Sequence, residues 1–232
     1  MRKIYRRLGY ILILLLLLVT IFIFDITFES NEIDKDIIEF KSRAVYVDSI
    51  DNFNYYKVIK KYDYEDSSNI CNNYTDISVG TIGDIYVTNS DPFGGFFVTE
   101  WISKYAWIGH AGMIYNEEGT KTIEIIGNGA KEDNVVKIYD NDWLEKVSSE
   151  LMVLRVKDIS KSDKSNIINE GEEIFGRKYD YTFLLGGNKR FYCLSLVSYI
   201  YKKIDIKLNN DMFFTTESDV ITNENTYMID SL

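Results

Sequence analysis

The chain has 232 residues, of which 46% are hydrophobic and 15% aromatic, so its composition excludes a disordered protein and fits one globular domain with a substantial core. Its net charge is −10, and because residues 1–24 contain four basic residues and no acidic one, the remainder carries −14 by difference. This acidic character disfavours nucleic acid and anionic lipid as binding partners.

The first feature along the chain is an uncharged apolar run from Leu8 to Phe24, which follows the four basic residues. At about 1.5 Å per residue, the run is just long enough to cross a bilayer core. A cleaved signal peptide is the alternative, but the run does not end in the small residues that cleavage requires. Basic residues before an apolar run place the N-terminus in the cytoplasm. The sequence therefore predicts a single-pass anchor in the cell membrane over residues 1–25, with the rest of the chain extracytoplasmic.

Residues 26–79 form a charged, tyrosine-rich segment without a regular hydrophobic period. We interpret this segment as a stalk or an added lobe, and it carries no motif that indicates a function. One of the two cysteines, Cys71, lies in it.

Residues 80–232 show clear strand and helix patterns and are expected to form one domain. Alternating or continuous apolar patterns predict strands at 83–87, 111–116, 121–127, 135–139 and 151–156. Helical spacing of apolar residues predicts helices at 96–105, 161–175 and 193–204. Strands dominate the middle of this region and helices flank it, so we expect an α+β domain in which an antiparallel sheet packs against helices.

The predicted helix at 193–204 begins with Cys193, at the end of a stripe of apolar positions. The unpaired N–H groups and positive dipole end of a helix start favour a thiolate and can also hold an oxyanion. Cys193 is therefore a candidate nucleophile. Two alternatives remain open: a small apolar side chain packed in the core, and a disulfide with Cys71, which would leave no reactive thiol.

The chain has one histidine, His110, at the start of a predicted hairpin. If the hairpin loop has three residues with Gly119 in the left-handed conformation, paired residue numbers sum to 236. Glu124 then lies diagonal to His110 on the same face, with space left between them by Gly112, and can orient the imidazole. A loop of two or four residues would make the sum 237 and turn Glu124 to the opposite face, where it would be an exposed carboxylate. Asn128 is the reserve candidate for this role.

The chain's motifs resemble those of a known family. The matching segments are Gly83-Asp84-Ile85, residues 107–114, Glu124, residues 176–181 and residues 192–197. Together they resemble the circularly permuted NlpC/P60 proteins of the papain-like superfamily, the YiiX and YebB-like group. The resemblance implies a permuted papain-like fold, a histidine that precedes the cysteine, and a Cys193–His110–Glu124 triad. Relatives often have Ser-Glu after the cysteine where this chain has Leu194 and Ser195, which puts the substrate preference in doubt.

Three functions are consistent with these residues. The first is a cysteine hydrolase that works by acyl transfer, as an amidase or peptidase on cell-wall peptides. The second is a lipid-directed thioesterase or acyltransferase, favoured by the expected anchor and by aromatic residues within 93–101. The third is a non-catalytic envelope binding protein on the same fold. No cofactor or metal is expected, since one histidine and two distant cysteines cannot compose a usual zinc site.

Overall fold

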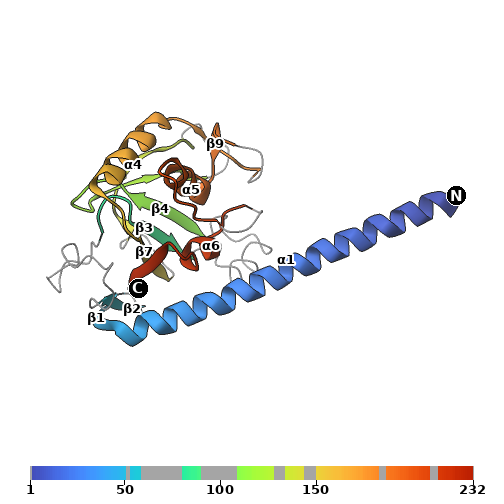
Figure 1. Cartoon of the computed structure of the whole chain (residues 1–232), viewed down its shortest axis with the longest axis horizontal. Helices are drawn as coiled ribbons and strands as arrows, with labels where there is room; N and C mark the ends of the chain where they lie inside the picture. The colour runs from blue at the N-terminus through green and yellow to red at the C-terminus, as the bar shows by residue number, and fades with distance from the viewer. Residues whose placement is uncertain are drawn as a thin grey trace.

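The computed structural model describes residues 2–50, 53–58, 80–89, 109–127, 134–143, 150–182, 187–209 and 214–231. Cys71, Asn128, the predicted helix at 96–105 and the aromatic residues within 93–101 lie outside these ranges. Figure 1 shows a rounded domain beside a long helix, α1 (Arg2–Arg43), whose N-terminal half projects away from it.

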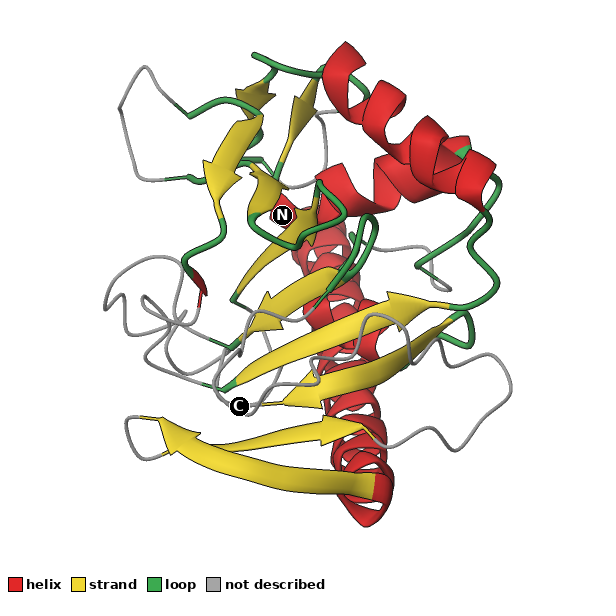
Figure 2. Cartoon of the chain, turned by 90° about the vertical axis from the view of Figure 1, so that its left-hand side faces the viewer, coloured by secondary structure: helices red, strands yellow, loops and turns green. Residues whose placement is uncertain are grey.

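The centre of the domain is an eight-stranded sheet in the order β1-β2-β10-β7-β3-β4-β5-β6, and its paired strands are antiparallel (Figure 2). The strands are β1 (Ala44–Ile50), β2 (Phe53–Val58), β3 (Ile85–Thr88), β4 (His110–Ile114), β5 (Lys121–Glu124), β6 (Lys137–Asp140), β7 (Leu151–Val156) and β10 (Thr226–Ser231). A separate parallel pair joins β8 (Lys178–Tyr179) to β9 (Arg190–Phe191). The predicted antiparallel sheet is confirmed, and β1, β2 and β10 were not predicted.

The helices of the domain are α4 (Lys161–Glu173), α5 (Cys193–Lys203) and α6 (Glu217–Ile221). α5 packs on β4 and on α4, and its Leu196, Val197 and Ile200 are fully buried. These three residues belong to the apolar stripe that the sequence pattern predicted, and burying them places the first turn of α5 against the strand that starts at His110. The predicted α+β architecture is therefore confirmed.

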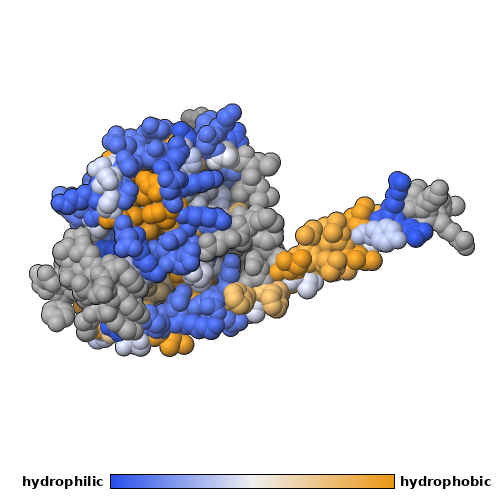
Figure 3. Space-filling view, viewed as in Figure 1, coloured by the Kyte–Doolittle hydropathy of each residue, from blue (hydrophilic) through white to orange (hydrophobic). Residues whose placement is uncertain are grey.

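The N-terminal region differs from the expectation. Within the described residues, no helix combines the length and apolarity that a bilayer span requires, so the predicted membrane-spanning helix of residues 1–25 is not supported. The apolar run does not form a helix of its own, because α1 continues without a break into a charged half that ends at Arg43. The large apolar side chains from Leu8 to Leu18 are each more than half exposed (Figure 3).

The second half of α1 belongs to the domain. Ile33 and Phe40 are fully buried, and Arg43 Nη2 donates a 2.7 Å hydrogen bond to the carbonyl oxygen of Met228 in β10. Residues 26–79, interpreted from sequence as a stalk or added lobe, thus contribute part of a helix and two strands of the central sheet.

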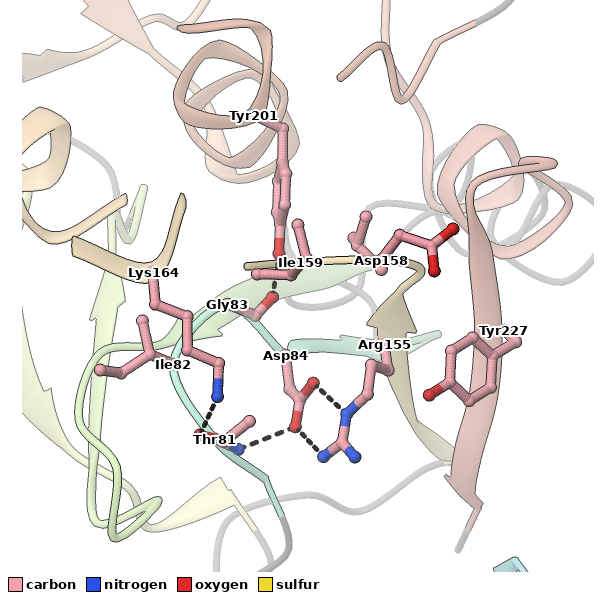
Figure 4. Close-up of a pocket in the computed structure, with 11 residues that line it drawn as sticks. Thr81, Ile82, Gly83, Asp84, Arg155, Asp158, Ile159, Lys164, Tyr201 and Tyr227 are labelled. Carbon is pink, nitrogen blue, oxygen red and sulfur yellow. Dashed lines mark hydrogen bonds and ion pairs between the residues drawn. The ribbon is translucent and has the colours of Figure 1, made fainter. Parts of the chain in front are cut away.

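A buried ion pair fixes the turn before β3. Arg155 of β7 donates from Nε to Asp84 Oδ1 at 2.8 Å and from Nη2 to Oδ2 at 2.6 Å (Figure 4). Both residues are buried. The Thr81 N–H donates to the same carboxylate at 2.8 Å, and the Thr81 hydroxyl accepts from Lys164 of α4 at 3.0 Å. The Tyr201 hydroxyl of α5 donates to the Gly83 carbonyl. The turn is thereby joined to β7, α4 and α5.

We expect Asp84→Asn to destabilise the domain by about 3–5 kcal/mol, because it leaves the Arg155 charge buried without its partner. Chemical denaturation measures this free energy of unfolding. Asp140→Asn is the matched control, since Asp140 pairs with Lys121 at the exposed surface and should contribute little. An Asp84→Asn variant as stable as the control would show that the ion pair does not hold the turn.

Candidate active site

His110 and Glu124 are brought together by the β4–β5 hairpin. Met113 pairs with Ile123 and Ile114 with Thr122, and Gly119 has φ +69°, so the predicted register is confirmed. His110 Nε2 lies 2.9 Å from Glu124 Oε2. A Cβ at Gly112 would lie 2.8 Å from Glu124 Cγ, which means that a larger residue there would displace the carboxylate.

Glu124 is 4% exposed, and its carboxylate has three side-chain partners. Besides His110, the Trp143 indole donates from Nε1 to Oε1 at 2.7 Å, and the Thr122 hydroxyl donates to the same oxygen. Burial favours the neutral acid, but these hydrogen bonds and the charge of His110 outweigh it and lower the pKa of Glu124. Glu124 is therefore an ionised group with a fixed orientation.

Trp143 is a site residue that the sequence analysis missed. Its ring stacks on the His110 ring with centroids 5.2 Å apart and an interplanar angle of 4°, and on Tyr86 at 5.4 Å and 23°. A buried tryptophan needs a partner for its indole N–H, but the sequence gives no sign that this partner is Glu124. Trp143 thus holds the imidazole from its face while Glu124 holds it from its edge.

Cys193 begins α5 as expected, and it is a buried free thiol with 8% exposure. The N–H of Tyr192, the N-cap residue, donates to Ser195 Oγ at 2.8 Å. At the third position of a helix, a glutamate makes the same contact in a capping box. Ser195, which stands where relatives often have glutamate, therefore caps the start of α5 in place of that residue.

A side-chain hydrogen bond joins Cys193 to His110. Because Glu124 occupies Nε2, the thiol is left with Nδ1. Burial disfavours the imidazolium, but the hydrogen bonds and negative charges of Cys193 and Glu124 outweigh it and raise the pKa of His110 to about 10. The imidazole is therefore protonated at neutral pH, when it can stabilise a thiolate and later donate a proton.

Two tyrosines and a second carboxylate surround these groups. Burial and the nearby Cys193 raise the pKa of both Tyr179 and Tyr192, so both remain neutral phenols. The Glu217 carboxylate is 3% exposed and accepts a hydrogen bond from the N–H of Gly109, the residue before His110.

The structure brings Cys193, His110 and Glu124 into one hydrogen-bonded chain, and Asn128 lies outside the described residues. Sequence reasoning missed Thr122, Trp143 and Glu217. In the described part of the chain, no three or more histidine, cysteine, aspartate or glutamate side chains are grouped as metal ligands would be.

Comparisons with known proteins give one family and a related structure. The model of a family described as permuted papain-like amidase enzyme, YaeF/YiiX, C92 family, matches residues 81–228. A solved structure, that of the metalloprotein yiiX from Escherichia coli O157:H7, is 20% identical over 56% of this chain and 69% of its own, with a TM-score of 0.44. No curated protein matches the chain. The family description does not carry the NlpC/P60 name that the sequence motifs suggested. Because the family model covers more than half of the chain, the protein belongs to the permuted papain-like amidases of the YaeF/YiiX, C92 family.

Proposed function

We propose that the chain is an amidase that hydrolyses cell-wall peptides by acyl transfer at Cys193. The observation that carries the proposal is the position of His110, whose ring links a free thiol at a helix start to a buried, ionised carboxylate. The family supports thiol-dependent amidase chemistry, and the three residues supply the groups that this chemistry needs.

In the first half of the reaction, the Cys193 thiolate attacks the carbonyl carbon of the amide, and a C–S bond forms. The oxygen becomes an oxyanion, which the N–H of Cys193 at the start of α5 can stabilise together with a neighbouring donor. His110 donates its proton to the leaving nitrogen, the C–N bond breaks, and the amine departs. A thioester remains on Cys193.

In the second half, the now neutral His110 removes a proton from water as the water attacks the thioester. The C–S bond breaks, the carboxylic acid leaves, and the thiolate and imidazolium are restored. Glu124 stays ionised throughout and keeps the imidazole in one orientation, while Trp143 prevents it from tilting.

A lipid-directed thioesterase or acyltransferase is the second candidate. A cysteine nucleophile can attack the carbonyl of an ester as well as that of an amide. The exposed apolar residues of α1 would hold such a site close to a lipid surface. A disulfide between Cys193 and Cys71 would have favoured the non-catalytic alternative, and that alternative loses this support because Cys193 is a free thiol.

We also propose that the protein is attached to the cell membrane through the N-terminal half of α1, with its domain on the extracytoplasmic side. The support is the row of exposed apolar side chains from Leu8 to Leu18, which covers none of the domain, with Arg6 and Arg7 before it.

Substitutions of Cys193, His110 and Glu124 should distinguish the nucleophile and its base from the orienting carboxylate. We expect Cys193→Ala and His110→Ala to lower kcat at least about 10³-fold, and Glu124→Gln to lower it about 10- to 100-fold, because an orienting group is partly replaceable. Steady-state kinetics measures the effect, and Glu118→Gln in the exposed hairpin turn is the control. Equal rates for wild type and Glu124→Gln would remove Glu124 from the mechanism.

The substrate class can be tested with the full chain in mild detergent. We expect the enzyme to release amines from peptidoglycan peptides and to hydrolyse long-chain acyl esters only slowly. The inactive variant Cys193→Ala is the negative control for both substrates. Faster turnover of the esters would favour the lipid-directed candidate over the amidase proposed here.

Membrane attachment can be tested by fractionating cells that produce the full chain. We expect the protein in the membrane fraction, resistant to high salt, because apolar contacts are not screened by ions. A variant with Leu12, Leu14 and Leu16 changed to Ser should shift toward the soluble fraction. Recovery of the unaltered chain in the soluble fraction would contradict the proposal.

A further inference from the structure

We propose that Glu217 is a positioning residue of this site, which fixes the backbone next to His110 and supports the protonated imidazole with its charge. This inference uses one part of the proposed function, namely that His110 donates and accepts the proton in the reaction. Glu217 lies in no motif that the sequence analysis used, and the reaction described above gives it no role.

The geometry ties Glu217 to the start of β4. Its buried carboxylate, on the first residue of α6, accepts hydrogen bonds from its own N–H and from the N–H of Gly109. Gly109 is also pressed against the end of β3, because a Cβ there would lie 1.9 Å from the carbonyl oxygen of Thr88. Glu217 therefore holds the peptide that precedes His110 at a point where β3 leaves no space for a side chain.

The electrostatics distinguish Glu217 from Glu124. Burial, with a smaller contribution from Asp219, raises the pKa of Glu217 to about 7, although its two backbone hydrogen bonds and the charge of His110 oppose this. Glu124, whose pKa is lowered, keeps its charge near neutral pH, whereas Glu217 gains or loses a proton there. Since the interaction between two charges is mutual, ionised Glu217 must favour the imidazolium of His110.

Few other titratable groups surround Glu217 in the described structure. Those that act on it or are affected by it are His110 of β4, Asp219 of α6, Tyr179 of β8 and Tyr192 before α5. Of the charged residues of α1, Asp36, Glu39 and Arg43 line a cavity with the opposite end of α6 and the residues that follow it.

The single histidine of the chain makes a direct test possible, because its imidazole NMR signals need no assignment. In the full-length wild type, we expect the His110 chemical shifts to show an inflection near pH 7, where Glu217 titrates, well below the titration of the imidazolium itself. In Glu217→Gln, which keeps a side-chain oxygen for the Gly109 N–H but carries no charge, this inflection should disappear. The imidazolium titration should also move to lower pH by about one unit.

Glu118→Gln is the matched control, and it should reproduce the wild-type titration. The proposal is overturned if wild-type His110 shows no inflection near pH 7, or if the inflection persists in Glu217→Gln. A purely structural Glu217 would lower the melting temperature on substitution and leave the His110 titration unchanged. The measurement needs no substrate, so a protein inactive on cell-wall peptides would defeat the proposed function and still leave this inference to be decided.

Discussion

The hydrogen bond between Glu124 and His110 is the contact on which the rest of the site depends. It requires two strands in one register, a glycine at 112 and a turn with Gly119 in the left-handed conformation. It also fixes which ring nitrogen faces the thiol, because Nε2 is occupied. A change in any of these features would separate the imidazole from Cys193 without altering either residue.

Buried charge in this domain is compensated at two places with different consequences. Asp84 and Arg155 neutralise each other through two hydrogen bonds, so their pairing is a structural constraint on the turn before β3. Around His110, the hydrogen bonds and negative charges of Cys193 and Glu124 outweigh the effect of burial and keep the ring protonated. The first arrangement stabilises the fold, and the second prepares the site for proton transfer.

The sequence predicted the parts of this site that follow from local patterns. The hairpin register followed from Gly119, the place of Cys193 from the apolar stripe of α5, and the contact of Glu124 with His110 from both. Trp143 and Glu217 could not be predicted, because their partners lie far along the chain and no periodicity marks them. The apolar run from Leu8 to Phe24 misled in another way: its composition indicated a separate span, whereas the helix continues into the domain up to Arg43.

In the proposed mechanism, Cys193 and Glu124 together keep His110 protonated, and an NMR titration of the imidazole measures this protonation. The wild-type ring should lose its proton near pH 10, and the ring of Cys193→Ala at clearly lower pH, because one hydrogen bond and one negative charge are gone. A wild-type ring that titrates near the ordinary value of 6.5, with no change in Cys193→Ala, would show that these two residues do not control the charge of His110.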